Sequence, residues 1–139
     1  MKIKNLKKKF SSYCKVNKLK INNNQISIIE LLIKFYISCF EKSFFDFFKD
    51  KNKKLGFYLF GDVGVGKTML LNFFYENLEI PKQRLHFNEF MIDFHDFSHA
   101  NKKDRKNNII ELFVKKISKQ YKLIYFDEFQ VTNIVDAMI

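Results

Sequence analysis

The sequence predicts an α/β fold in which helices flank a parallel β-sheet. Short apolar runs alternate with longer segments of helical periodicity through the second half of the chain, as expected for strands joined by crossover helices. A glycine-rich phosphate-binding pattern lies between one such run and the following helix, and another apolar run ends in two adjacent acids. The 139 residues correspond to about one ordinary domain.

Charge divides the chain into two regions. Residues 1–54 hold 14 Lys against 4 acidic residues, a net charge of +10, whereas residues 55–139 hold 11 basic and 11 acidic residues, a net charge of zero. We therefore predict a basic N-terminal helical region over 1–54 and a separate α/β domain from residue 55. The basic region could attract nucleic acid or an anionic membrane surface, or it could be a solvated lysine surface that reflects the preference for Lys over Arg throughout the chain.

The basic region is predicted to contain one long helix. Residues 1–24 are interpreted as an irregular lead, and the polar residues between Gln25 and Lys49 form one stripe of helical period. Glu30 and Lys34 are spaced for an ion pair on that helix. Both charges lie in its longest apolar stretch, which is also too short to predict a membrane span; a helix lying on a membrane surface is the alternative.

The α/β region divides into alternating elements. Apolar runs predict strands and 3.6-residue periodicity predicts helices, while Pro81 and a polar cluster separate them. The expected order is strand 55–60, helix 67–78, strand 84–88, helix 89–99, loop 101–108, helix 109–121 and strand 123–126. Asn133 and Asp136 resemble the start of one more helix, so we interpret the sequence as C-terminally truncated.

The glycine-rich pattern carries the clearest chemistry. It matches G-x-x-x-x-G-K-[ST] with Gly61, Asp62, Val63, Gly64, Val65, Gly66, Lys67 and Thr68. Glycines permit the unusual dihedrals with which a loop points consecutive backbone N–H groups at a polyphosphate. Lys67 would supply a cation for the phosphates, and the Thr68 hydroxyl could ligate Mg²⁺. The octapeptide therefore predicts binding of ATP.

The acid pair completes the pattern. The apolar strand 123–126 runs directly into Asp127 and Glu128, and carboxylates at the end of a buried strand are costly unless a cation or water uses them. We expect Asp127 to hold Mg²⁺ and Glu128 to act as the general base toward an attacking water. His86, His95 and His99 could act as metal ligands, but no further Cys or His completes a ligand set. Packing or surface roles are therefore favoured for them.

Three blocks of sequence resemble the ZapE-type cell-division ATPases and their mitochondrial AAA+ relatives: residues 56–71, residues 84–91 with His95, and residues 126–139. The segment from Tyr13 to Gln25 is similar to their N-terminal region. The sequence departs from the family pattern at Asn88 and Asn133.

The resemblance implies an AAA+ type P-loop fold, in which residues 55–139 form the N-terminal part of the ATPase domain. It also implies ATP hydrolysis with Mg²⁺, catalysed by Lys67 and Glu128, a protein partner of the division-ring or quality-control type, and self-association. A cytoplasmic location is expected, either free or peripheral at the inner membrane. In the family, a further strand separates the phosphate-loop strand from the acid-pair strand, and it would follow the present sequence.

Two other functions remain open. The family's sensor residue, arginine finger and lid have no counterpart in residues 1–139, so the chain could bind nucleotide without turnover. Alternatively, the basic region could serve a nucleic-acid-associated P-loop protein, although the near absence of Arg and of Gly-aromatic interleaving disfavours nucleic acid.

Overall fold

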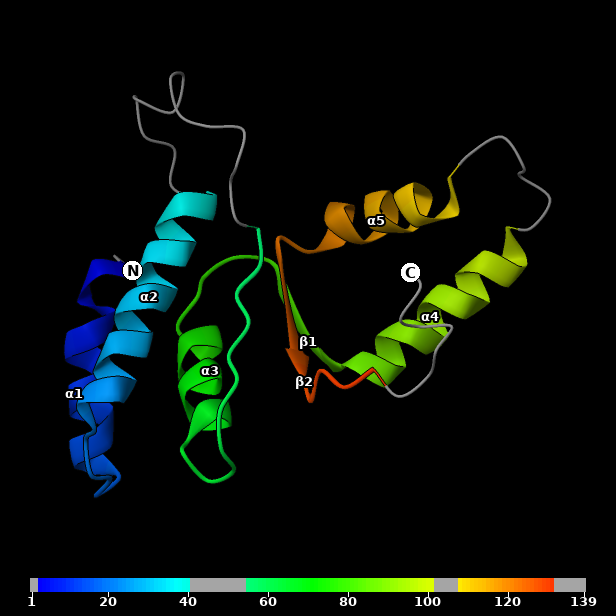
Figure 1. Ribbon diagram of the computed structural model, residues 1–139. Helices are drawn as coiled ribbons and strands as arrows, with labels where there is room; N and C mark the ends of the chain where they lie inside the picture. Colours follow the sequence, from blue (N-terminus) through cyan, green and yellow to red (C-terminus); the bar gives the residue numbers. More distant parts are fainter. Residues whose placement is uncertain (1–2, 41–54, 102–107, 132–139) are drawn as a thin grey trace. The chain divides into compact units, whose positions relative to one another are not determined.

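The computed structural model describes residues 3–40, 55–101 and 108–131 (Figure 1). The chain divides into two compact units, Met1–Leu78 and Glu79–Ile139. The first is helical, and the second is a two-stranded parallel sheet with two helices. The described part of the chain thus combines helices with a small parallel sheet, consistent with the predicted α/β class.

The first unit contains the short 3-10 helix η1 (Ile3–Asn5), α1 (Leu6–Val16), α2 (Asn23–Phe40) and α3 (Lys67–Glu76). The prediction of an irregular lead over 1–24 was wrong, because α1 occupies its centre. Leu6, Phe10 and Cys14 recur every four residues, and all three are 0% exposed. In the sequence, the lysines between these residues mask the helical period.

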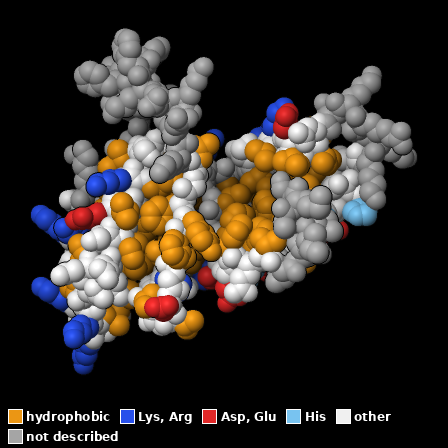
Figure 2. Space-filling view, viewed as in Figure 1, with side chains coloured by type: hydrophobic (Ala, Val, Ile, Leu, Met, Phe, Trp, Pro, Cys, Tyr) orange, Lys and Arg blue, Asp and Glu red, His pale blue; other side chains and the backbone are white. Residues whose placement is uncertain are grey.

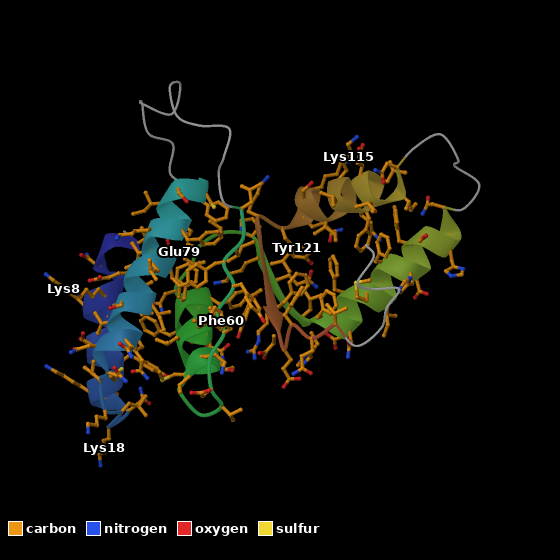
Figure 3. The ribbon with its side chains drawn as sticks, viewed as in Figure 1. Lys8, Lys18, Phe60, Glu79, Lys115 and Tyr121 are labelled. Carbon is orange, nitrogen blue, oxygen red and sulfur yellow. The ribbon has the colours of Figure 1, made fainter. Side chains whose placement is uncertain are left out.

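The core of the first unit lies among these three helices. Phe10 meets Phe73 of α3 edge-on, with ring centres 5.1 Å apart, and Ile29 of α2 is also fully buried. α3 contributes Leu70, Phe73 and Phe74 to this core, whereas Met69 is only half-buried. The lysines of α1 face outward: Lys8 points away from the helices in Figure 3, and Figure 2 shows blue side chains along this edge.

An ion pair joins α1 to α2. Lys7 Nζ donates to Glu30 Oε1, and this hydrogen bond and the lysine charge hold the pKa of Glu30 below its usual value, with a smaller effect from Lys34. The sequence predicted Lys34 as the partner. Lys7 lies within residues 1–24, for which the sequence predicted no helix.

The predicted strand 55–60 is not a strand. The segment has no regular secondary structure, and Leu55 and Phe60 are each 79% exposed. A parallel strand is held by neighbours in its sheet, and the sheet formed by the described residues has only two strands, neither of them from this segment. The apolar composition of residues 55–60 was therefore not enough to predict a strand.

The second unit is built on two parallel strands, β1 (Lys82–His86) and β2 (Leu123–Asp127). α4 (Phe87–Ala100) and α5 (Ile109–Gln120) connect them (Figure 1). These bounds confirm the predicted elements to within two residues. α4 begins earlier than expected because His86 and Glu89 cap its first turn reciprocally.

Phenylalanines fill the core of the second unit. Phe87, Met91 and Phe94 of α4 and Phe113 of α5 are buried together, and Phe126 of β2 packs against them. β2 is half-buried along its whole length, so the predicted buried strand is only partly covered. Register pairs Leu85 with Phe126 on one face of the sheet and Arg84 with Tyr125 on the other.

Some predictions fall outside the described residues: the end of the long helix near Lys49, most of the loop 101–108, and the helix start at Asn133 and Asp136. Within the described ranges, no helix combines the length and the apolar character needed to cross a bilayer.

Replacing Phe10 by Ala should destabilise the first unit by about 3–5 kcal/mol, because the ring is fully buried and its removal leaves a cavity against Phe73. Urea denaturation followed by circular dichroism measures the change. Lys8→Ala, on the exposed side of the same helix, should stay within about 0.5 kcal/mol of the parent chain. Equal effects of the two substitutions would contradict the packing of α1.

Candidate functional site

Residues 61–66 form a turn that leads directly into α3. Gly61, Gly64 and Gly66 have φ values of 150°, 82° and 87°, in the region that side-chain-bearing residues rarely adopt. No atom lies within 4 Å of where a Cβ of Gly61 or Gly64 would stand. The concave path of this backbone is thus open, as a loop that receives a ligand at close range requires.

Lys67 folds back across this turn. Its Nζ donates to the carbonyl oxygens of Gly61 at 2.9 Å and Asp62 at 2.7 Å. Gly66, the N-cap of α3, provides no side-chain cap, so the first N–H groups of the helix are left to other acceptors. A cation and the positive end of a helix dipole therefore act on the same short loop, an arrangement suited to a polyphosphate.

The remaining predicted loop residues lie around this centre. Asp62 contributes its carbonyl, Val63 is 99% exposed and Val65 is 50% exposed. Thr68 is the second residue of α3, and its side chain is exposed. All eight residues of the pattern thus lie within the first unit and on one turn of the chain.

A hollow of about 570 Å³ adjoins the loop. It is lined by Lys20, Ile21, Asn22, Asn23 and Gln25, which lie before and at the start of α2, and by Gly64 and Val65 of the loop. Gln25 Nε2 lies 3.4 Å from the Val65 carbonyl oxygen, to which it donates. Gln25 could not be predicted from the sequence, because its contact with Val65 spans 40 residues.

The acid pair lies at the carboxyl end of β2 in the second unit. Asp127 Oδ2 is paired with Arg84 Nη2, and the Asp127 side chain is 17% exposed. Tyr125 Oη lies 3.5 Å from Asp127 Oδ1. Glu128 is exposed and has a φ of 53°, which is unusual for a residue with a long side chain.

Arg84 and Tyr125 were not among the predicted site residues. The Cζ of Arg84 lies 5.3 Å from the centre of the Tyr125 ring. Burial is the largest influence on the Tyr125 hydroxyl and raises its pKa; the Asp127 charge raises it further, while Arg84 lowers it. The available signals were the rarity of Arg in the chain and the position of Tyr125 two residues before Asp127 on the same strand face.

Each half of the predicted site is thus assembled inside its own unit. The first unit brings Lys67 onto the carbonyl groups of Gly61 and Asp62, and the second places Asp127 and Glu128 at the end of β2. In the described part of the chain, no three or more His, Cys, Asp or Glu side chains gather as a metal-binding cluster.

The chain is similar in sequence to several known proteins. The sequence profile of the AFG1-like ATPases matches residues 16–139. Lactation elevated protein 1 homolog B of Danio rerio is 42% identical over 94 residues, 60% of this chain and 19% of the relative. Cell division protein ZapE of Escherichia coli is 38% identical over 85 residues, 60% of this chain and 22% of the relative.

An uncharacterized protein of Schizosaccharomyces pombe is 41% identical over 90 residues, 60% of this chain and 20% of that protein. The chain therefore matches about a fifth of the length of these relatives. No solved structure gives a significant match.

Replacing Gly66 by Ala should destabilise the first unit by about 1–2 kcal/mol or more, because φ is 87° and the added Cβ would lie 3.2 Å from Gln25 Nε2. Gly64→Ala is the matched control, with a φ of 82° and no neighbour within 4 Å, so it tests the dihedral cost alone. Denaturation curves of both variants separate the two effects. No destabilisation in either would contradict the loop conformation.

Proposed function

Because the chain belongs to the AFG1-like ATPase family, we propose that it binds ATP together with Mg²⁺ and hydrolyses it. The observation that supports ATP most directly is the position of Lys67, whose ammonium group crosses a glycine turn at the start of α3. The loop, the cation and the helix terminus together suit the binding of a nucleoside triphosphate.

In this proposal, residues 61–68 hold the phosphates. Backbone N–H groups of the turn and of the first turn of α3 donate to phosphate oxygens, which approach closely because glycines line the path. Lys67 exchanges the carbonyl oxygens of Gly61 and Asp62 for phosphate oxygens. This exchange replaces neutral acceptors by charged ones and so favours the bound state.

Thr68 and Asp127 are the proposed ligands of Mg²⁺, since a hydroxyl and a carboxylate are the oxygen donors that this ion prefers. When bound, Mg²⁺ would neutralise charge on the β- and γ-phosphates. The short side chain of Thr68 is accessible at the start of α3. Asp127 ends a strand whose half-buried backbone fixes the position of its Cα.

Glu128 is the proposed general base. Its carboxylate is exposed to solvent, where it can accept a proton from the attacking water. Its φ of 53° supports a functional role, because a non-glycine residue in this region costs about 1–3 kcal/mol and such strain is concentrated at active sites.

We further propose an ATPase of the AAA+ type that acts on a protein partner and associates with copies of itself. The name of the Escherichia coli relative supports a role in cell division, although the chain covers only 22% of that protein. A cytoplasmic location, either free or peripheral at the inner membrane, is part of the same proposal. The exposed lysines of α1 would suit contact with an anionic surface.

Nucleotide binding without turnover is the second candidate function. Two observations favour it: Asp127 is paired with Arg84, and residues 55–60, which lead into the loop, are not held in a sheet. Preorganised positioning contributes most of the rate in phosphoryl transfer, so a loosely held site would retain affinity and lose rate.

Substitutions of Lys67 and Glu128 distinguish these candidates. Lys67→Ala should weaken ATP binding by about tenfold or more, because it removes the cation from the loop. Glu128→Gln should bind ATP normally and release phosphate about 10²–10⁴-fold more slowly, because the amide cannot accept the proton. Nucleotide affinity by fluorescence and phosphate release provide the measurements.

Lys8→Ala, which removes an equivalent charge from the exposed side of α1, is the control and should change neither quantity. Binding in the unsubstituted chain without any phosphate release would support the second candidate. Unchanged affinity in Lys67→Ala would exclude the loop as the phosphate site.

A further inference from the structure

Three side chains converge on one face of the sheet in the second unit. Register places Arg84 of β1 opposite Tyr125 of β2, and Asp127 lies two residues further along β2, on the same side of the sheet. The other side carries Leu85 and Phe126, of which Phe126 packs against the α4 and α5 core. Arg84, Tyr125 and Asp127 therefore form a polar group on the face opposite this core.

The three residues contact one another. The Arg84 guanidinium pairs with Asp127 Oδ2 and lies over the Tyr125 ring, and the Tyr125 hydroxyl faces Asp127 Oδ1 at 3.5 Å. A planar guanidinium can stack on a ring while it pairs with a carboxylate, which an ammonium group cannot do equally well. Among 23 Lys and 2 Arg, an arginine occupies this position.

This arrangement conflicts with the proposed role of Asp127. A carboxylate that already neutralises a guanidinium offers less charge to a second cation, and the two cations repel each other at short range. We propose that Arg84 is a resident counter-ion that competes with Mg²⁺ for Asp127, so that metal loading requires Arg84 to release the carboxylate. The inference rests on the proposed ATP and Mg²⁺ site and concerns its regulation.

The exposure of the pair favours this role over a structural one. The Arg84 side chain is 40% exposed and the Asp127 side chain 17%, and ion pairs in contact with solvent contribute little to stability. The unit is instead held by the ring cluster of α4, α5 and β2 on the opposite face. Substitution of Arg84 should therefore change the affinity for metal and leave the fold intact.

Binding of Mn²⁺, a paramagnetic substitute for Mg²⁺, tests the competition without requiring turnover. The full chain is saturated with a non-hydrolysable ATP analogue, and free Mn²⁺ is measured by electron paramagnetic resonance. Arg84→Gln should tighten Mn²⁺ binding by about fivefold or more, the effect of removing one nearby charge in a largely solvated setting. Arg84→Lys keeps the charge but stacks on Tyr125 less well, so it should tighten Mn²⁺ binding by less than Arg84→Gln does.

Two controls isolate Asp127 as the point of competition. Lys115→Gln removes the same charge from the exposed surface of α5, where Figure 3 shows Lys115, and should leave Mn²⁺ affinity unchanged. Asp127→Asn should weaken Mn²⁺ binding, and in that background Arg84→Gln should have a smaller effect than in the parent chain, since the two residues act on one interaction. Circular dichroism verifies the fold of each variant.

Unchanged or weaker Mn²⁺ binding in Arg84→Gln would overturn the inference while leaving ATP binding by the chain in place. If Arg84→Gln does not fold, Arg84→Met replaces it as the test. It also removes the charge and should tighten Mn²⁺ binding; no tightening there counts equally against competition. No nucleotide-dependent Mn²⁺ binding in the parent chain would overturn both this inference and the proposed function.

Discussion

The first unit depends on the backbone conformation of one turn. Positive φ values at Gly61, Gly64 and Gly66 let the chain reverse and enter α3 without a side-chain cap. The same reversal brings the Lys67 ammonium onto two carbonyl groups of the turn. α3 is anchored at its other end by Phe73 and Phe74, which pack into the core shared with α1 and α2. A glycine turn is thus attached to a well-packed helix, and the position of the cation follows from both.

In the second unit, the packing of one sheet face determines the chemistry of the other. Phe126 is drawn into the ring cluster with Phe87, Phe90 and Phe113, so the residues on either side of it in the strand must face the opposite way. This alternation is why Tyr125 and Asp127 lie together and why Arg84 meets both. The phenylalanine cluster therefore fixes the orientation of the polar group.

Features that depend on neighbouring residues could be predicted from the sequence, whereas features that depend on distant contacts could not. The phosphate-loop pattern was readable because its glycine dihedrals depend on neighbouring residues, and α4 and α5 because their periodicity is strong. α1 was missed where lysines masked the spacing of Leu6, Phe10 and Cys14. Residues 55–60 were assigned wrongly because a strand exists only with partners, which composition cannot supply. The contacts of Gln25 and Arg84 span about 40 residues and depend on packing and register, so they required the structure.

The backbone at Glu128 has an evolutionary consequence. Its left-handed conformation is one that glycine or asparagine adopts more readily, so either replacement would relieve strain at that position. Selection for thermostability alone would therefore drive residue 128 away from glutamate, whereas selection for the general-base role proposed for Glu128 would retain it. In a population of variants, the identity of residue 128 would report which of the two pressures has acted.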